Sequence, residues 1–291
     1  MPGSVQELVE LLDLEAIEDN LFRGTQPATS LQRVFGGQVA AQALAAATRT
    51  VPDEYVVHSL HSYFLRPGDV KVPIVYDVDP LRDGRSFVTR RVVARQHGRP
   101  IYFQTASYQK HEEGFEHQDA MPDVSRPEEC PSLGELFGRE SQEHSERWER
   151  EWAALDVRWA GDSRPGGELD PSVHPAQVRL WIRVNGDLPD DRLLHGAAFT
   201  YASDLTLLGA SLVPHGVHVA SPEVQSASLD HTIWFHRPFR ADEWWLYDQL
   251  SPSASGGRGL AFGRVFTQDG RLVATVAQEG LVRPARPPES R

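Results

Sequence analysis

The chain has 291 residues and a formal net charge of −12 at pH 7. This length fits two domains of ordinary size, or one domain that is built from two halves. The negative charge disfavours nucleic-acid binding, since that function needs a basic face to neutralise phosphates. Most of the charge lies in one place, because residues 111–170 contain 17 Asp and Glu, six Arg and no Lys.

The sequence also restricts the compartment. The single cysteine, Cys130, rules out an internal disulfide and is typical of a reducing compartment. No stretch approaches the ~20 apolar residues of a membrane span. The N-terminal MPGSVQELVELLDLE lacks the basic region of a signal peptide, and the C-terminus is not a Ser-Lys-Leu address. We therefore expect a cytoplasmic protein without a membrane span.

Two helices followed by four strands are predicted for the first part of the chain. Residues 5–18 place Leu at helical spacing, which indicates a short amphipathic helix. Residues 35–51, FGGQVAAQALAAATRTV, begin with two Gly and continue as an Ala-rich run, which is typical of a closely packed, buried helix. From 55 to 109 the pattern predicts strands, and the last two are joined through HGR as a hairpin.

The acidic middle segment, residues 111–175, is rich in Glu, Pro, Ser and Gly. One polar helix is predicted within 133–155, and the rest has the composition of a connector. A loop of this length is unusual inside a compact domain. We therefore expect a linker that crosses the surface from one half of the molecule to the other.

The second part of the chain repeats the pattern of the first. A strand precedes a buried helix within 195–213, for which Ser203 is the predicted N-cap and Asp204 lies in the first turn. A strand at 226–239 follows, and we expect the strand at 243–255 to pair with it. A long hairpin with QDGR at its turn ends this part.

Two matching stretches indicate that the pattern is a duplication. HSLHSYFLRP at 58–67 and ASLDHTIWFHRP at 227–238 both contain Ser-Leu, then alternating polar and aromatic residues, then Phe-x-Arg-Pro. The hairpin turns match as well, with Gly98 in one and Gly270 in the other. Helix, strands and hairpin therefore occur twice.

These stretches resemble the acyl-CoA thioesterase II (TesB-type) family. RVFGGQVAAQAL and HSLHSYFLRPGD in the first half, and ASLDHTIWFHRPF and VAQEG in the second, carry the resemblance, which runs from about Phe22 to Arg283. It implies an α+β double hotdog, in which each of two units wraps an antiparallel sheet around a helix. We expect the two units at 1–110 and 176–291, with 111–175 as the linker.

The resemblance also implies a function and three catalytic residues. The function is hydrolysis of a fatty acyl-CoA thioester to a free fatty acid and coenzyme A. The Asp, the Thr or Ser and the Gln that the family uses fall at Asp204, Ser228 and Gln278. Ser228 stands where Thr is the commoner residue, which keeps the hydroxyl group and loses a methyl group.

The chemistry of a thioester suits this trio. Its leaving thiolate has a solution pKa of roughly 8.5, so the reaction needs an aimed water and oxyanion donors rather than a strong acid. Asp204 can accept a proton from water, and Ser228 and Gln278 can hold that water or the carboxylate by hydrogen bonds.

The oxyanion donors are expected at the start of the first buried helix. Backbone N–H groups at a helix N-terminus bind negative charge, and glycine allows a ligand to approach the backbone closely. We therefore expect Gly36, Gly37 and Gln38 to contribute to substrate binding. Helix packing alone is the competing explanation for the two glycines.

The two halves are not equivalent at these positions. Where the second half has Asp204, the first half is expected to have Gly37 or Gln38. Where the second half has Gln278, the first has Ala106 or Ser107. The polar trio therefore belongs to one half.

Other functional classes require motifs or residue spacings that this sequence lacks. An α/β-hydrolase needs G-x-S-x-G and a nucleotide-binding protein needs a glycine-rich phosphate loop, and the sequence has neither motif. A hotdog enoyl-CoA hydratase pairs its Asp with a His a few residues on, but His215 lies eleven positions after Asp204. A non-catalytic acyl-CoA-binding protein is the third alternative, and loss of Asp204 or Gln278 would have favoured it.

No cofactor and no metal site are expected. His58 and His61 are three residues apart on a predicted strand, which places them on opposite faces. The partner is expected to be the acyl-CoA substrate. A homo-oligomer is also expected, because the edge strands of hotdog units usually pair with another unit.

Overall fold

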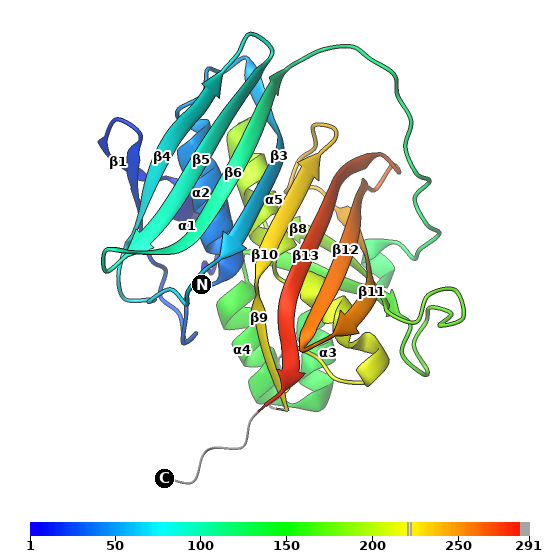
Figure 1. Ribbon diagram of the computed structural model, residues 1–291. Helices are drawn as coiled ribbons and strands as arrows, with labels where there is room; N and C mark the ends of the chain where they lie inside the picture. The colour runs from blue at the N-terminus through cyan, green and yellow to red at the C-terminus, as the bar shows by residue number, and fades with distance from the viewer. Residues whose placement is uncertain (220, 222, 286–291) are drawn as a thin grey trace, which may run out of the picture.

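The computed structural model of the protein describes residues 1–219, 221 and 223–285. Its strands form one antiparallel sheet in the order β1-β2-β4-β5-β6-β3-β10-β13-β12-β11-β8-β7, and β9 also pairs with β13 (Figure 1). The strands are β1 (Glu15–Glu18), β2 (Leu21–Gly24), β3 (Tyr55–Phe64), β4 (Ile74–Asp83), β5 (Phe87–Gln96), β6 (Arg99–Lys110), β7 (Leu155–Asp162), β8 (Gln177–Val184), β9 (Val224–Ser228), β10 (Asp230–Phe235), β11 (Trp245–Ser255), β12 (Arg258–Thr267) and β13 (Leu272–Pro284).

Two buried helices lie against this sheet, one in each half of the molecule, and they contact each other (Figure 1). The helices are α1 (Val5–Leu12), α2 (Gly36–Thr48), α3 (Leu133–Glu140), α4 (Gln142–Trp152) and α5 (Arg192–Ser203), with 3₁₀ helices η1 (Pro127–Glu129) and η2 (Leu207–His215). Every residue of α2 from Gly37 to Ala47 is buried, because its Ala side chains let both α5 and the sheet approach closely. This arrangement confirms the expected α+β double hotdog.

The two repeated strands pair with each other. Residues Ser59–Tyr63 of β3 lie antiparallel to Asp230–Trp234 of β10, and this ladder joins the two halves into one sheet. The hairpin turns of both halves use glycine with positive φ, at Gly98 and Gly270. The edge of each hotdog unit that β3 or β10 forms is therefore paired inside the chain.

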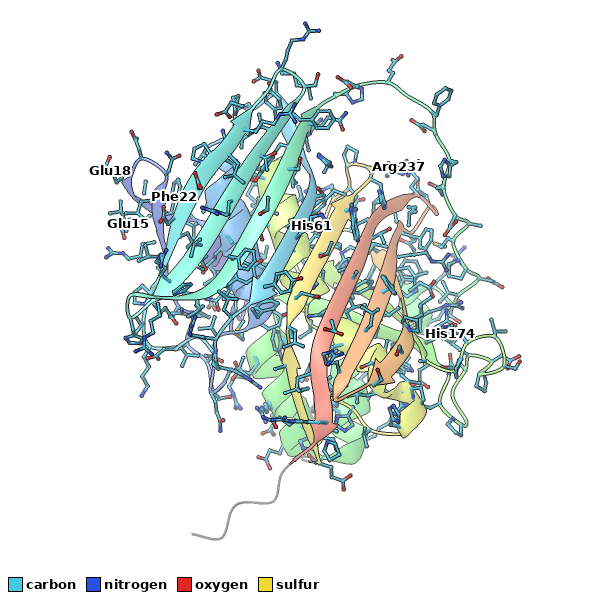
Figure 2. All side chains as sticks on the ribbon, viewed as in Figure 1. Glu15, Glu18, Phe22, His61, His174 and Arg237 are labelled. Atoms are coloured by element: carbon cyan, nitrogen blue, oxygen red, sulfur yellow. The ribbon has the colours of Figure 1, made fainter. Side chains whose placement is uncertain are left out.

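The strand order of the sheet ends at β1 and β7. All four residues of β1 are exposed, and Figure 2 shows Glu15 and Glu18 at this margin of the molecule. A short, acidic edge strand is a poor template for pairing with another chain. Within the described residues, no helix is long and apolar enough to cross a membrane.

Several boundaries differ from the sequence predictions. The helix expected at 5–18 ends at Leu12, because Asp13 adopts an extended conformation and β1 follows. The helix expected within 195–213 is instead α5, which ends at Ser203, and a separate 3₁₀ helix. The strand at 226–239 is interrupted at Leu229, and β11 pairs with β8 and β12 rather than with it.

The segment 111–175 is more than a connector. It contributes β7 to the sheet beside β8, and its single predicted helix is in fact two, α3 and α4. The break falls at Ser141, whose extended backbone ends α3 and whose hydroxyl group accepts a hydrogen bond from the His144 N–H to cap α4. The expected division at 110 and 175 stays a prediction.

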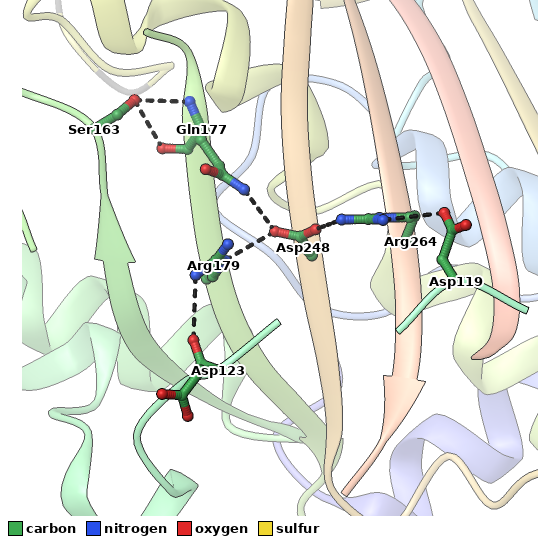
Figure 3. A network of polar contacts seen from close by, with 7 residues as sticks. All are labelled: Asp119, Asp123, Ser163, Gln177, Arg179, Asp248 and Arg264. Atoms are coloured by element: carbon green, nitrogen blue, oxygen red, sulfur yellow. Dashed lines mark hydrogen bonds and ion pairs between the residues drawn. The ribbon is translucent and has the colours of Figure 1, made fainter. Parts of the chain in front are cut away.

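The acidic residues at the start of this segment are bound to the second half of the sheet (Figure 3). The fully buried Asp248 of β11 accepts hydrogen bonds from Arg179 (3.0 Å) and Arg264 (2.6 Å). Arg264 also binds the Asp119 carboxylate (3.1 Å), and Arg179 donates to the Asp123 carbonyl (3.3 Å). The charge of Asp119 is therefore neutralised by Arg264 of β12, and Arg179 of β8 holds the backbone of the segment.

Candidate active site

Three polar side chains from different elements meet at the end of α5. Asp204 follows α5 directly, Ser228 ends β9, and Gln278 lies on β13. The Ser228 hydroxyl donates to Asp204 Oδ1 (3.1 Å), and Gln278 Nε2 donates to both Ser228 Oγ (2.9 Å) and Asp204 Oδ1. The structure thus brings together the three residues that the sequence analysis selected as catalytic.

The position of Asp204 on its helix was predicted wrongly. It is the C-cap of α5 and not a first-turn residue, so it lies at the helix end that disfavours negative charge. Burial raises the pKa of Asp204 to about 6, although hydrogen bonds from Gln278, Ser228 and the Gly37 N–H act in the opposite direction. A carboxylate with such a pKa suits a general base near neutral pH.

The glycines at the start of α2 allow this carboxylate to approach the helix. A Cβ atom on Gly36 would lie 2.6 Å from Asp204 Oδ2, and one on Gly37 would collide with the carbonyl oxygen of Tyr201. The two glycines are therefore required for close packing of α2 against the end of α5, and this packing brings Asp204 to the start of α2. The positive end of α2 faces Asp204 and offers it the Gly37 N–H.

Gln38 is not part of this arrangement. Its side chain is 1% exposed, and its Nε2 donates to Gln26 Oε1 (3.0 Å) and to the Thr25 carbonyl (3.4 Å). These bonds fix the segment before α2, and Gln38 does not line the cavity described next.

A cavity of about 730 Å³ opens beside Asp204, which is within the usual size of a small-molecule site. Asp204, Ser228 and Gly36 lie at its wall, whereas Gln278 is fully buried behind them. Exposed Arg side chains, Arg33 and Arg66 among them, lie around it. Its apolar lining includes Val34, Phe35, Val39, Phe64, Trp152 and Leu208.

Sequence reasoning missed one neighbour of Asp204. His231 of β10 is fully buried, and its Nδ1 lies 4.0 Å from Asp204 Oδ1. Its Nε2 lies 2.9 Å from Ser203 Oγ, and burial lowers the pKa of His231 to about 3, so the ring is neutral. Counted back from the shared Phe-x-Arg-Pro, its matching position in the first half is the apolar Leu60, and this contrast is the signal that was available in the sequence.

The two arginines of the repeated Phe-x-Arg-Pro make structural hydrogen bonds. Arg66 and Arg237, the two arginines of the repeated Arg-Pro, donate to the Pro100 carbonyl (2.7 Å) and the Leu272 carbonyl (2.8 Å) at matching places. Over the residues that the structure describes, no group of three or more His, Cys, Asp or Glu side chains is arranged to hold a metal ion.

Comparisons with known proteins agree along most of the chain. Residues 162–281 match the family described as "Acyl-CoA thioesterase", and residues 25–109 match "Acyl-CoA thioesterase N-terminal domain". "Acyl-CoA thioesterase 2" of Haemophilus influenzae is 41% identical over 286 residues, which cover 97% of this chain and 99% of that protein.

Solved structures give the same result. An acyl-CoA thioesterase II, TesB2, from Mycobacterium marinum superposes with a TM-score of 0.80 at 48% identity, over 96% of this chain and 98% of the other. A protein with a hot dog fold from Alicyclobacillus acidocaldarius superposes with a TM-score of 0.75 at 23% identity, over 96% and 98% of the two chains, and supports the fold alone.

Proposed function

The chain belongs to the acyl-CoA thioesterase family, and we propose that Asp204, Ser228 and Gln278 activate the water that hydrolyses the thioester. The products are a free acid and coenzyme A. The apolar lining of the cavity supports a fatty acyl group as the substrate, because burying apolar chain stabilises the complex by about 0.8 kcal/mol per methylene. The convergence of the three polar side chains beside this cavity carries the proposal.

The hydrogen bonds suggest which carboxylate oxygen is the base. Oδ1 of Asp204 is occupied by Ser228 and Gln278, whereas Oδ2 lies against Gly36 at the cavity wall. Ser228 and Gln278 are therefore assigned to orienting the carboxylate. Oδ2 is left to take a proton from a water placed between it and the thioester carbon.

The rest of the reaction follows from this placement. The water oxygen bonds to the thioester carbon, its proton goes to Asp204, and negative charge develops on the carbonyl oxygen. Because the Gly37 N–H is directed at Asp204, the Gly36 N–H and the positive end of α2 are the proposed stabilisers of this oxyanion. When the carbon–sulfur bond breaks, the thiolate takes the proton from Asp204 and the base is restored.

Thiol release from short to long acyl-CoAs, measured for wild type and Asp204→Asn side by side, tests the proposal. We expect kcat to fall by about 10² to 10⁴ in the variant, the usual contribution of a general base. In wild type the rate should fall as the pH drops below about 6, because Asp204 becomes protonated. A variant with wild-type turnover would remove Asp204 from the mechanism.

One observation favours the hydratase alternative and another argues against it. Asp204 does have a histidine nearby, but His231 is fully buried and is not among the residues that line the cavity. Its ring is therefore not placed to act on a substrate. Loss of the double bond of an enoyl-CoA without thiol release would favour the hydratase, and saturable binding without either reaction would favour a carrier.

We also propose a cellular location and an assembly state for this protein. A cytoplasmic location is one of them. Self-association is the other, and β1 and β7 at the two ends of the sheet are edges at which it could occur, since β3 and β10 pair within the chain. Light scattering in solution would give the number of chains per particle.

A further inference from the structure

Part of the cavity wall comes from a segment that lies outside both matched regions. The matches cover 25–109 and 162–281, and helices α3 and α4 fall between them. Phe137 of α3 and both Trp148 and Trp152 of α4 nevertheless line the cavity beside Asp204. The wall is therefore built by a segment between the two matched regions, and the sequence analysis did not predict it.

The rings of this wall form a continuous row that begins at the reacting groups. Phe35, the residue before Gly36, contacts Trp152 edge-to-face with ring centres 4.9 Å apart. Trp152 lies 6.2 Å from Trp148, and Trp148 lies 5.3 Å from Phe137. An acyl chain that extends from a thioester carbon near Asp204 along this row would meet aromatic surface over its length.

The two tryptophans are the only apolar residues of α4. Its eleven residues, QEHSERWEREW, contain no other apolar side chain, and Trp148 and Trp152 are four apart, on one face of the helix. Both are half-buried: they pack against the margin of the core on one side and line the cavity on the other. A helix that is otherwise polar and charged thus presents its only apolar face to the cavity.

A buried carboxylate fixes the position of this helix. The Glu151 side chain is 3% exposed and accepts hydrogen bonds from Thr29 Oγ1 (2.7 Å), from Ser30 N (2.9 Å) and Ser30 Oγ (2.6 Å), and from the Met1 ammonium group (3.1 Å). Burial alone would raise the pKa of Glu151, but these hydrogen bonds outweigh it and lower the pKa to about 2. Glu151 therefore stays ionised and ties α4 to the segment that leads into α2.

We propose that helices α3 and α4 are the acyl-selecting wall of the active site. Trp148 and Trp152 contact the acyl chain, and Glu151 is a positioning residue that sets the distance of the wall from Asp204. The inference rests on the proposed thioesterase function and specifies which part of the chain discriminates between acyl groups.

The test compares kcat/KM over straight-chain acyl-CoAs from short to long for wild type and three variants. Trp148→Ala enlarges the cavity and should change the ratio of long-chain to short-chain kcat/KM by about tenfold, since each methylene in an apolar pocket is worth at least that much. Trp148→Phe should change the ratio less. Glu149→Ala, an exposed neighbour on α4 that does not line the cavity, should leave it unchanged.

Glu151→Gln tests the positioning role with the tryptophans in place. It should flatten the chain-length profile, because the wall loses its fixed distance, while kcat for the best substrate changes less than KM. Equal loss of activity on all chain lengths in Trp148→Ala, or an unchanged profile, would overturn the inference. Wild type without turnover on any acyl-CoA would instead overturn the proposed function, and the chain-length dependence of acyl-CoA binding in the same variants would then decide about the wall.

Discussion

Helices α2 and α5 occupy matching places in the two halves, and each ends on a charged residue, but the charges are opposite. Arg49 caps the end of α2, where it binds Asp13 and the Leu14 carbonyl and remains partly exposed. A cation at a helix C-terminus is favourable. Asp204 caps α5, where its charge is unfavourable and buried. The true counterpart of Asp204 is therefore Arg49, and not Gly37 or Gln38 as expected.

The sheet shows the same contrast. In the first half Leu60 pairs with Ala106 across β3 and β6. In the second half the register that pairs Thr232 with Ala277 places His231 beside Gln278. An apolar pair in one half thus matches a polar pair in the other. At these positions the first half has residues that stabilise the fold. The second half has buried polar residues that cost stability and lie at the site, where strongly shifted pKa values indicate function.

The largest effect is expected from removing the charge at the end of each helix. Asp204→Asn should abolish most turnover yet raise the free energy of unfolding at pH 7 by about 1–3 kcal/mol, because a buried charge with a raised pKa is removed. Arg49→Gln should lower it by about 0.5–1 kcal/mol with kcat unchanged. Urea unfolding and thiol release measure both quantities. If both variants lost stability alike, the two helix ends would not differ as described.

A smaller effect is expected when Gln278 is replaced by the residue of the first half. Gln278→Ala removes two hydrogen bonds from the site and should lower kcat about 10- to 100-fold, and Ser228→Ala should cost about tenfold or less. Because these bonds lower the pKa of Asp204, the acid limb of the pH–rate profile should move to higher pH in both variants. An acid limb at the wild-type pH in both variants would contradict the role of Ser228 and Gln278 in orienting Asp204.

The smallest effect concerns stability alone. The pKa of His231 is about 3 in the folded protein and near 6.5 in the unfolded chain. As the pH falls from 6.5 toward 3, the unfolded chain binds a proton that the folded protein does not, and the free energy of unfolding decreases. His231→Leu, which restores the first-half residue type, should remove roughly 2 kcal/mol of the stability lost between pH 7 and pH 5. His117→Leu, in the exposed connector, is the control. Identical pH dependence in wild type and His231→Leu would refute this assignment.

Much of the fold was visible in the sequence because it is local and repeated. The Ala-rich helix, the two hairpins and their glycines follow from periodicity and turn chemistry, and a duplicated strand marks the halves. The three polar residues of the site came from the resemblance, and no spacing would have selected Ser228 by itself.

The rest depends on contacts between distant segments. That Asp204 ends a helix, rather than beginning one, is decided by how α5 meets the start of α2. The docking of Asp119 on Arg264 is likewise tertiary. The wall of α4 was missed although it has a local signal, since two tryptophans four residues apart in a charged helix need an apolar partner.

The pairing of β3 with β10 also has a consequence for biosynthesis. Ser62 and His231, which meet across this ladder, are 169 residues apart in the chain. At ~5–20 residues per second, roughly 10 to 30 s pass on the ribosome between the emergence of the two strands. During that interval the nascent first half presents an open strand, and nascent-chain chaperones or rapid completion of the second half must protect it from other chains.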